Sequence, residues 1–152
     1  MHVLVATDGS TQSLEAARYL RRIVDPSVVT RVGVVAITSP LAAVPFAAEG
    51  HEQSGLETSF RRAAEAAAQD LADALAGWGP PVRVHVYSGS PATEIVKAAK
   101  RFESGLVVLA SRSGRAQAAL LGSVAHKVMT QAPCPVLVHR PGPKPKRSRA
   151  AR

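Results

Sequence analysis

Residues 106–138, LVVLASRSGRAQAALLGSVAHKVMTQAPCPVLV, predict a buried strand, a loop of small and polar residues, a helix and a second strand. The loop ends at Gly122-Ser123, where the helix should begin. Free backbone N–H groups at a helix start, a Gly that lets an anion approach and a neighbouring Ser hydroxyl together make a phosphate site. The same pair could instead only turn the chain and cap the helix, so both interpretations stay open.

A second change from strand to helix is predicted by the first twenty residues, MHVLVATDGSTQSLEAARYL. A short, almost wholly apolar strand is typical of a parallel sheet that is covered on both faces. Asp8 would lie at the carboxyl end of this strand, and ligands of open parallel sheets collect there, where the strand order reverses. Its carboxylate could accept hydrogen bonds from ribose hydroxyls or hold a metal ion. Alternatively, Asp8, Ser10 or Thr11 could cap the following helix.

Five apolar runs alternate with helical patterns along the chain, which predicts right-handed crossovers and a parallel α/β sheet. The expected strands are residues 2–6, 32–37, 82–87, 106–110 and 136–139. The expected helices are residues 11–24, 56–76 and 91–102 and a fourth from near Gly122 to before Pro133. Residues 39–54 show no strong period and should form an excursion beside the strand-end crevice. Its His51 has no second His or Cys at metal-ligand spacing.

Five motifs follow one another along the chain: VLVATDGS at 3–10, Gly-Ser-Pro at 89–91 with Ala92, Glu94 and Ile95 behind it, the strand 106–110, Leu-Gly-Ser-Val at 121–124, and Ala-Pro-Cys-Pro-Val-Leu-Val at 132–138. In this order they resemble the universal stress protein family over nearly the whole chain, up to about residue 140. Each motif is weak alone, but the ordered set is specific. The resemblance implies a doubly wound five-stranded sheet in the order 3-2-1-4-5, with two helices on each face, as in the adenine nucleotide alpha hydrolase-like fold.

The resemblance also implies a nucleotide site. Nucleotide-binding members of the family carry an Asp after the first strand and, after the fourth, a Gly-two-residues-Gly-nine-residues-Gly-Ser/Thr loop. On this pattern Asp8 would lie near the adenosine, and the backbone of Ile37 would contact the adenine edge. Gly122 and Ser123 would hold phosphate, and Val124 follows them in the helix. The implied ligand is ATP or another adenine nucleotide, with Mg²⁺ accompanying it.

The opening half of the loop departs from that pattern. Ala110 occupies the first Gly position, and the second falls on Ser113 or Gly114. Only eight or seven residues then precede Gly122, against nine in the pattern. The methyl group of Ala110 would crowd the close backbone approach that a ligand needs. The shorter loop would also move its N–H groups relative to the phosphates.

Two cations of this loop, Arg112 and Arg115, could compensate as phosphate partners or could be merely solvated. The chain has neither the Lys-bearing loop GxxxxGK[ST] nor GxGxxG. It also has no Ser-His-Asp or Cys-His signature, and its five histidines are scattered. We therefore do not expect an efficient enzyme, although weak ATPase activity stays open.

Two functions are compatible with these motifs. The first is a cytoplasmic stress-response regulator that binds ATP in the strand-end crevice. The alternative is a nucleotide-free dimeric interaction module whose degenerate loop holds nothing. Residues 135–139 would form the edge of a sheet in the order 3-2-1-4-5 and are apolar on both sides, which predicts a homodimer through this strand.

The formal charge of +8 is concentrated at the end of the chain. Residues 141–152, PGPKPKRSRAAR, carry five cationic and no acidic side chains, which leaves +3 on residues 1–140. We expect a domain over 1–140 and a disordered basic tail, 141–152, which contacts nucleic acid at most non-specifically because it has no aromatic residues. The single cysteine, Cys134, is expected to be a packing residue and favours a reducing compartment. The sequence has no apolar run as long as a membrane span, so we expect a cytoplasmic location and no membrane partner.

Overall fold

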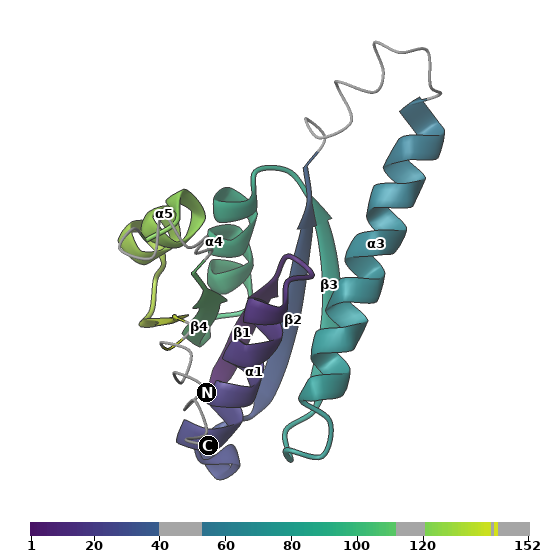
Figure 1. The fold of residues 1–152 in the computed structure, drawn as a ribbon. Helices are drawn as coiled ribbons and strands as arrows, with labels where there is room; N and C mark the ends of the chain where they lie inside the picture. The colour runs from purple at the N-terminus through teal and green to yellow at the C-terminus, as the bar shows by residue number, and fades with distance from the viewer. Residues whose placement is uncertain (40–52, 112–120, 141, 143–152) are drawn as a thin grey trace, which may run out of the picture.

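The computed structural model describes residues 1–39, 53–111, 121–140 and 142, and its strands form one parallel sheet (Figure 1). The strands are β1 (His2–Thr7), β2 (Arg31–Thr38), β3 (Val82–Ser88), β4 (Ser104–Ala110) and β5 (Val136–His139). The helices are α1 (Thr11–Ile23), the short 3-10 helix η1 (Pro26–Val28), α3 (Gln53–Ala74), α4 (Pro91–Arg101) and α5 (Ser123–Gln131). The strand order is β3-β2-β1-β4-β5, so the predicted fold and strand order are confirmed.

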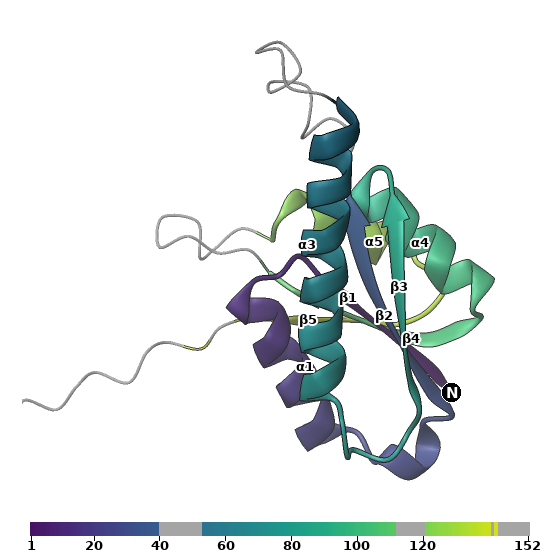
Figure 2. The same cartoon turned by 90° about the vertical axis from the view of Figure 1, so that its right-hand side faces the viewer.

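Helices cover both faces of the sheet, with α1 and α3 on one face and α4 and α5 on the other (Figures 1 and 2). Because successive side chains of a strand point to opposite faces, the strands contribute side chains to a separate core on each face of the sheet. The core under α1 and α3 contains Val3, Val5, Val32, Val34, Val108, Leu20, Leu71 and Leu75. The core under α4 and α5 contains Leu4, Val35, Val107, Leu109, Ile95, Ala99 and Val128.

The start of β4 differs from the sequence prediction, which placed it at residue 106. The strand begins at Ser104, which pairs with His2 at the start of β1. The Ser104 hydroxyl and His2 Nδ1 lie 2.9 Å apart in a buried hydrogen bond. A polar residue can therefore start this strand because its partner comes from another strand, and an apolar pattern does not reveal that partner.

Helix α3 also differs from its predicted bounds of 56–76. It begins at Gln53, so the last part of the predicted excursion 39–54 is helical. It ends at Ala74, where the Leu75 N–H donates to the carbonyls of both Leu71 and Ala72 and so tightens the last turn. Residues 40–52, with His51, lie outside the described part of the chain.

The other boundaries agree with the prediction or differ from it by one residue, as expected for helix and strand ends. Strands β1, β2 and β3 each continue one residue further than predicted, and β2 also begins one residue earlier, at Arg31. Val24 and Phe102 act as C-caps rather than helical residues. Helix η1 was not predicted; Asp25 caps it by accepting the Ser27 N–H at 2.9 Å. None of the helices in the described ranges is long and apolar enough to cross a membrane.

Candidate functional site at the carboxyl ends of β1 and β4

The order of the strands reverses between β1 and β4. The chain passes from β1 to β2 and β3 on one side, and returns to the other side of β1 to form β4 and β5. Helix α1 follows β1 onto one face, and the chain after β4 leads to α5 on the opposite face. Open α/β sheets bind ligands at the carboxyl ends of the two strands beside such a reversal, a region that we call the crevice.

The loop after β1 presents Asp8 to solvent at this crevice. Ser10 is the N-cap of α1, and its hydroxyl accepts the Ser13 N–H at 3.2 Å. Asp8 Oδ1 accepts the Ser10 N–H at 3.0 Å. Of the three capping residues that the sequence allowed, Ser10 is therefore the cap. Asp8 holds the turn before the helix and keeps an exposed carboxylate at the strand end.

Two buried hydroxyls fix the shape of this loop. Thr7 Oγ1 accepts the Gly9 N–H at 3.1 Å and lies 2.9 Å from Ser13 Oγ. The Ser13 hydroxyl donates to the Ser10 carbonyl at 2.7 Å, so its only proton is used there and the Thr7 hydroxyl donates to Ser13. Neither residue was predicted from the sequence to belong to the site. Hydroxyls on either side of an Asp-Gly turn were the available signal.

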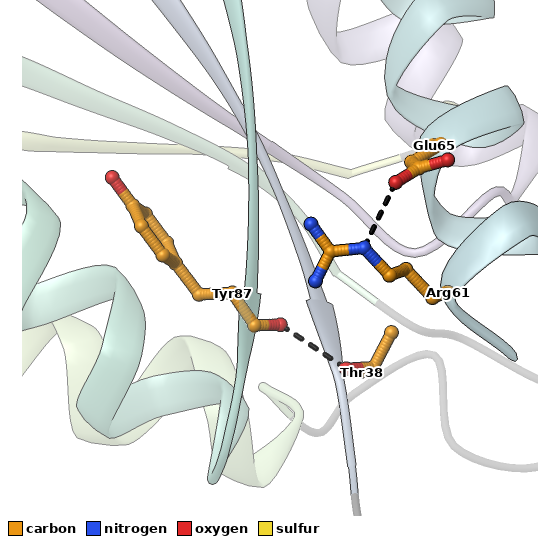
Figure 3. Close-up of polar contacts among 4 residues, drawn as sticks. All are labelled: Thr38, Arg61, Glu65 and Tyr87. Atoms are coloured by element: carbon orange, nitrogen blue, oxygen red, sulfur yellow. Dashed lines mark hydrogen bonds and ion pairs between the residues drawn. The ribbon is translucent and has the colours of Figure 1, made fainter. Parts of the chain in front are cut away.

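Helix α3 packs against the same loop. Gly9 has a φ of +79°, and a Cβ on it would lie 3.3 Å from Ala67 Cβ, so the loop needs glycine here. Arg61 lies six residues before Ala67 in α3, which is about 9 Å along the helix axis. Its Nε forms an ion pair with Glu65 Oε1 at 3.0 Å, on the opposite side of the sheet from Tyr87 (Figure 3).

The end of β2 borders the crevice through its backbone. The pairing of β1 with β2 runs to Thr7 and Ala36, whereas the pairing of β2 with β3 continues to Thr38 and Ser88. Strand β2 therefore extends past the paired part of β1 at Ile37 and Thr38. The Thr38 hydroxyl donates to the Tyr87 carbonyl at 3.3 Å, which secures this extension to β3 (Figure 3).

Strand β4 lies beside β1 on the other side of the reversal, and α5 is the next described element along the chain. Ala110 ends β4 and pairs with His139, and the buried Ser111 donates its N–H to the His139 carbonyl at 2.9 Å. Gly122 is the N-cap of α5 and offers no side chain for capping, while Ser123 is the first helical residue and is exposed. Gly122 therefore starts the helix without a side-chain cap, and its role in holding a phosphate stays a prediction.

Space around Gly122 is open. A Cβ on it would meet no atom of the described residues within 4 Å, and its φ of −56° is accessible to any residue. Val124 follows in the first turn and is 37% exposed. The remaining predicted loop residues, Arg112, Ser113, Gly114 and Arg115, lie outside the described residues, as do the tail residues 141 and 143–152.

The described residues give little support for metal binding or for a reactive thiol. No group of three His, Cys, Asp or Glu side chains there could hold a metal ion. Cys134 is half-buried and packs against the core under α4 and α5, in agreement with its predicted packing role. Burial raises the pKa of its thiol, which lowers its nucleophilic reactivity at neutral pH.

The family model described as the universal stress protein family matches residues 1–140. The chain belongs to the universal stress protein family. It is 32% identical over 148 residues to the universal stress protein MJ0531 of Methanocaldococcus jannaschii, covering 95% of this chain and 83% of that protein. It is also 32% identical over 146 residues to the universal stress protein YxiE of Bacillus subtilis, covering 91% of this chain and 97% of that protein.

Solved structures of this family have the same fold. The hypothetical protein MJ0577 superposes with a TM-score of 0.78 at 20% identity, over 93% of this chain and 96% of that one. A universal stress protein in complex with cAMP superposes with a TM-score of 0.59 at 22% identity, over 92% of this chain and 96% of that one. An Arabidopsis thaliana family member with AMP bound superposes with a TM-score of 0.62 at 16% identity, over 98% of this chain and 97% of that one.

Proposed function

We propose that this chain binds an adenine nucleotide, with ATP as the preferred ligand, in the crevice between the carboxyl ends of β1 and β4. The observation that carries the proposal is the exposed Asp8 carboxylate in a rigid turn at the position where the strand order reverses. Two family members of the same fold are complexes with cAMP and AMP, which supports an adenine nucleotide as the class of ligand.

Each wall of the crevice supplies a different part of the recognition. Asp8 would accept hydrogen bonds from ribose hydroxyls, and the Ile37 backbone beyond the end of β1 would contact the adenine edge. The first N–H groups of α5, at Gly122, Ser123 and Val124, would hold phosphate through their partial positive charge. The open space at Gly122 fits the close approach of a phosphate.

Titration calorimetry with ATP, ADP, AMP and cAMP, with and without Mg²⁺, tests this proposal. Asp8→Asn keeps an oxygen for the Ser10 N–H but removes the charge, so it should weaken binding without loosening the turn. Gly122→Val should weaken binding because it blocks backbone approach, yet the local backbone accommodates a side chain. Arg115→Ala should cost less, because it removes only a screened charge. Absence of binding heat at millimolar nucleotide would contradict the proposal.

The alternative, a nucleotide-free interaction module, is favoured by one observation. Ala110 places a methyl group at the family's first Gly position and is half-buried at the end of β4. The ultraviolet spectrum of protein purified without added nucleotide, then denatured and filtered, separates the two functions. A co-purified adenine nucleotide would absorb near 260 nm. If the filtrate lacks that absorption and calorimetry shows no binding heat, the nucleotide-free interaction module is the function.

We also propose that the chain forms a homodimer through residues 135–139. Strand β5 is the edge of the sheet, and its side chains alternate as predicted, with Val136 and Val138 toward α4 and α5 and Leu137 toward α1 and α3. Two-fold pairing of this strand with its copy would satisfy its outward N–H and C=O groups. Val138→Pro should give monomer because proline removes a ladder donor. Sedimentation equilibrium checks this, and a one-chain mass for the wild type would contradict the dimer.

The proposed cellular role is regulation of a stress response in the cytoplasm rather than catalysis. It rests on the family membership and on the sequence, which has a single cysteine and no nucleophile-base signature. We propose that the domain spans residues 1–140 and that the basic tail is dispensable for folding. Truncation after residue 141 should leave the melting temperature nearly unchanged. A large drop would show that the tail packs on the domain.

A further inference from the structure

Four rings from distant parts of the sequence gather on the face of the sheet that carries α4. The Phe102 ring centroid lies 4.7 Å from that of His85 and 5.3 Å from that of His2. The His85 and Tyr87 rings are nearly parallel, at 9°, with centroids 6.1 Å apart. Tyr87 projects from β3 on the side of the sheet away from α3 (Figure 3). These contacts make a continuous row of rings from the start of β1 to the edge strand β3.

Three rings of this row are partly accessible to solvent. His85, Tyr87 and Phe102 are half-buried, whereas His2 is buried. Helix α4 packs mainly on β1, β2 and β4, and β3 is the edge strand, so the α4 face of β3 is only partly covered. Figure 2, which views the molecule from the β3 edge, shows α3 and α4 on opposite sides of this strand.

Exposed arginines lie near the two histidines of this row. Arg83 shares the face of His85 and Tyr87 on β3, Arg31 begins β2, and Arg101 ends α4. Burial lowers the pKa of His85, and the charges of Arg101 and Arg83 lower it further. The pKa of His2 is lowered by burial and then by the charge of Arg31. The charges felt by both histidines are thus positive, so this surface attracts anions.

We propose that this ring patch, formed by Arg31, Arg83, His85, Tyr87, Arg101 and Phe102, binds single-stranded nucleic acid. Bases would stack on the half-buried rings while the arginines contact the phosphates, the combination that sequence-tolerant single-strand binders use. A single strand is the polyanion that presents free ring faces, whereas a duplex buries its bases in the stack. The patch lies on the α4 face of the sheet and runs from Arg31 and Arg83, near the amino ends of β2 and β3, to Tyr87, near the carboxyl end of β3.

Fluorescence anisotropy with a labelled single strand of about 12 nucleotides, in RNA and DNA versions, tests the proposal at about 50 mM salt. The double variant Arg83→Glu/Arg101→Glu should abolish or strongly weaken binding. Its matched control, Arg18→Glu/Arg22→Glu, makes the same charge change on exposed positions of α1 on the other face and should bind nearly as wild type. Both variants keep the basic tail, so any contribution of the tail is common to them.

Two further measurements separate charge from stacking. Loss of two phosphate contacts should reduce the slope of log K against log salt by about 1.4. Tyr87→Leu keeps the apolar bulk and should weaken binding about fivefold or more because one base loses its stacking surface, whereas Tyr87→Phe should bind as wild type. A thermal melt verifies that each variant is folded, and the arginine pair alone decides the case if Tyr87→Leu does not fold.

Three outcomes would overturn the proposal. The first is no anisotropy change with wild-type protein at low salt. The second is equal weakening by the patch and control charge reversals, which would assign binding to the tail or to net charge. The third is a duplex of the same length competing as well as the single strand, which would exclude stacking on the rings.

Discussion

The two ends of the sheet use different physics to organise polar residues. At the carboxyl end, the hydroxyls of Thr7 and Ser13 and the N–H of Gly9 form hydrogen bonds within one short loop. Toward the amino end, His2, His85 and Phe102 come from three separate elements and are held by ring packing and by the long-range hydrogen bond between His2 and Ser104. The first end is a rigid turn that presents a carboxylate, and the second is a surface of rings among cations.

This difference explains why the two ends would suit different ligands. A short hydrogen-bonded loop fixes backbone groups within one segment, which favours a compact ligand with defined donors and acceptors. Rings that lie side by side on neighbouring strands give a broad surface, which favours a ligand that stacks and repeats. Three predictions test whether the ends differ in this way.

The largest expected effect is at the carboxyl end. Thr7→Val should lower the free energy of unfolding by about 1–3 kcal/mol, because the part-buried Gly9 N–H and the buried Ser13 hydroxyl each lose a partner. Thr7→Ser keeps the hydroxyl and should cost less. Urea denaturation measures both values. Equal losses for the two variants would show that packing of the methyl group, rather than hydrogen bonding, fixes this loop.

A smaller effect is expected at Gly9. Gly9→Ala should cost about 1–2 kcal/mol, because its φ of +79° disfavours a side chain and the added Cβ approaches Ala67. Gly55→Ala, in α3 with open space around it, should instead stabilise the chain by up to about 1 kcal/mol. Thermal unfolding of the two variants distinguishes them, and shifts of the same sign would contradict a conformational requirement for glycine at position 9.

The smallest expected effect is a pH dependence of the free energy of unfolding that arises from His2 and His85. The pKa values of His2 and His85 are lowered from 6.5 in the folded chain, mainly by burial. The unfolded chain therefore binds more protons, so stability should be complete above pH 6.5 and fall as the pH drops below it. His85→Gln should flatten this dependence between about pH 5 and 7. An unchanged profile in urea titrations at several pH values would exclude His85 as its source.

Much of the fold could be predicted because its signals are local. The apolar runs of β1 and β4 and the Thr-Asp-Gly-Ser turn each lie within a few residues, and the structure confirms the strands and their order. The predicted start of β4 was wrong because Ser104 is satisfied by His2, which is far away in the sequence. At the site, sequence patterns indicated Asp8 and Gly122 but missed Thr7 and Ser13, although the hydrogen bond between these two hydroxyls lies within one short loop.

The sequence by itself determined the parallel sheet, the turn at Asp8 and the glycine at the start of α5, because periodicity, turn chemistry and helix starts depend on neighbouring residues. Only the tertiary structure decided that Ser10 rather than Asp8 caps α1 and that Ala67 requires Gly9. It alone brought His2, His85 and Phe102 together. Contacts between distant segments depend on how strands pair and how helices cross them, and no local pattern encodes that geometry.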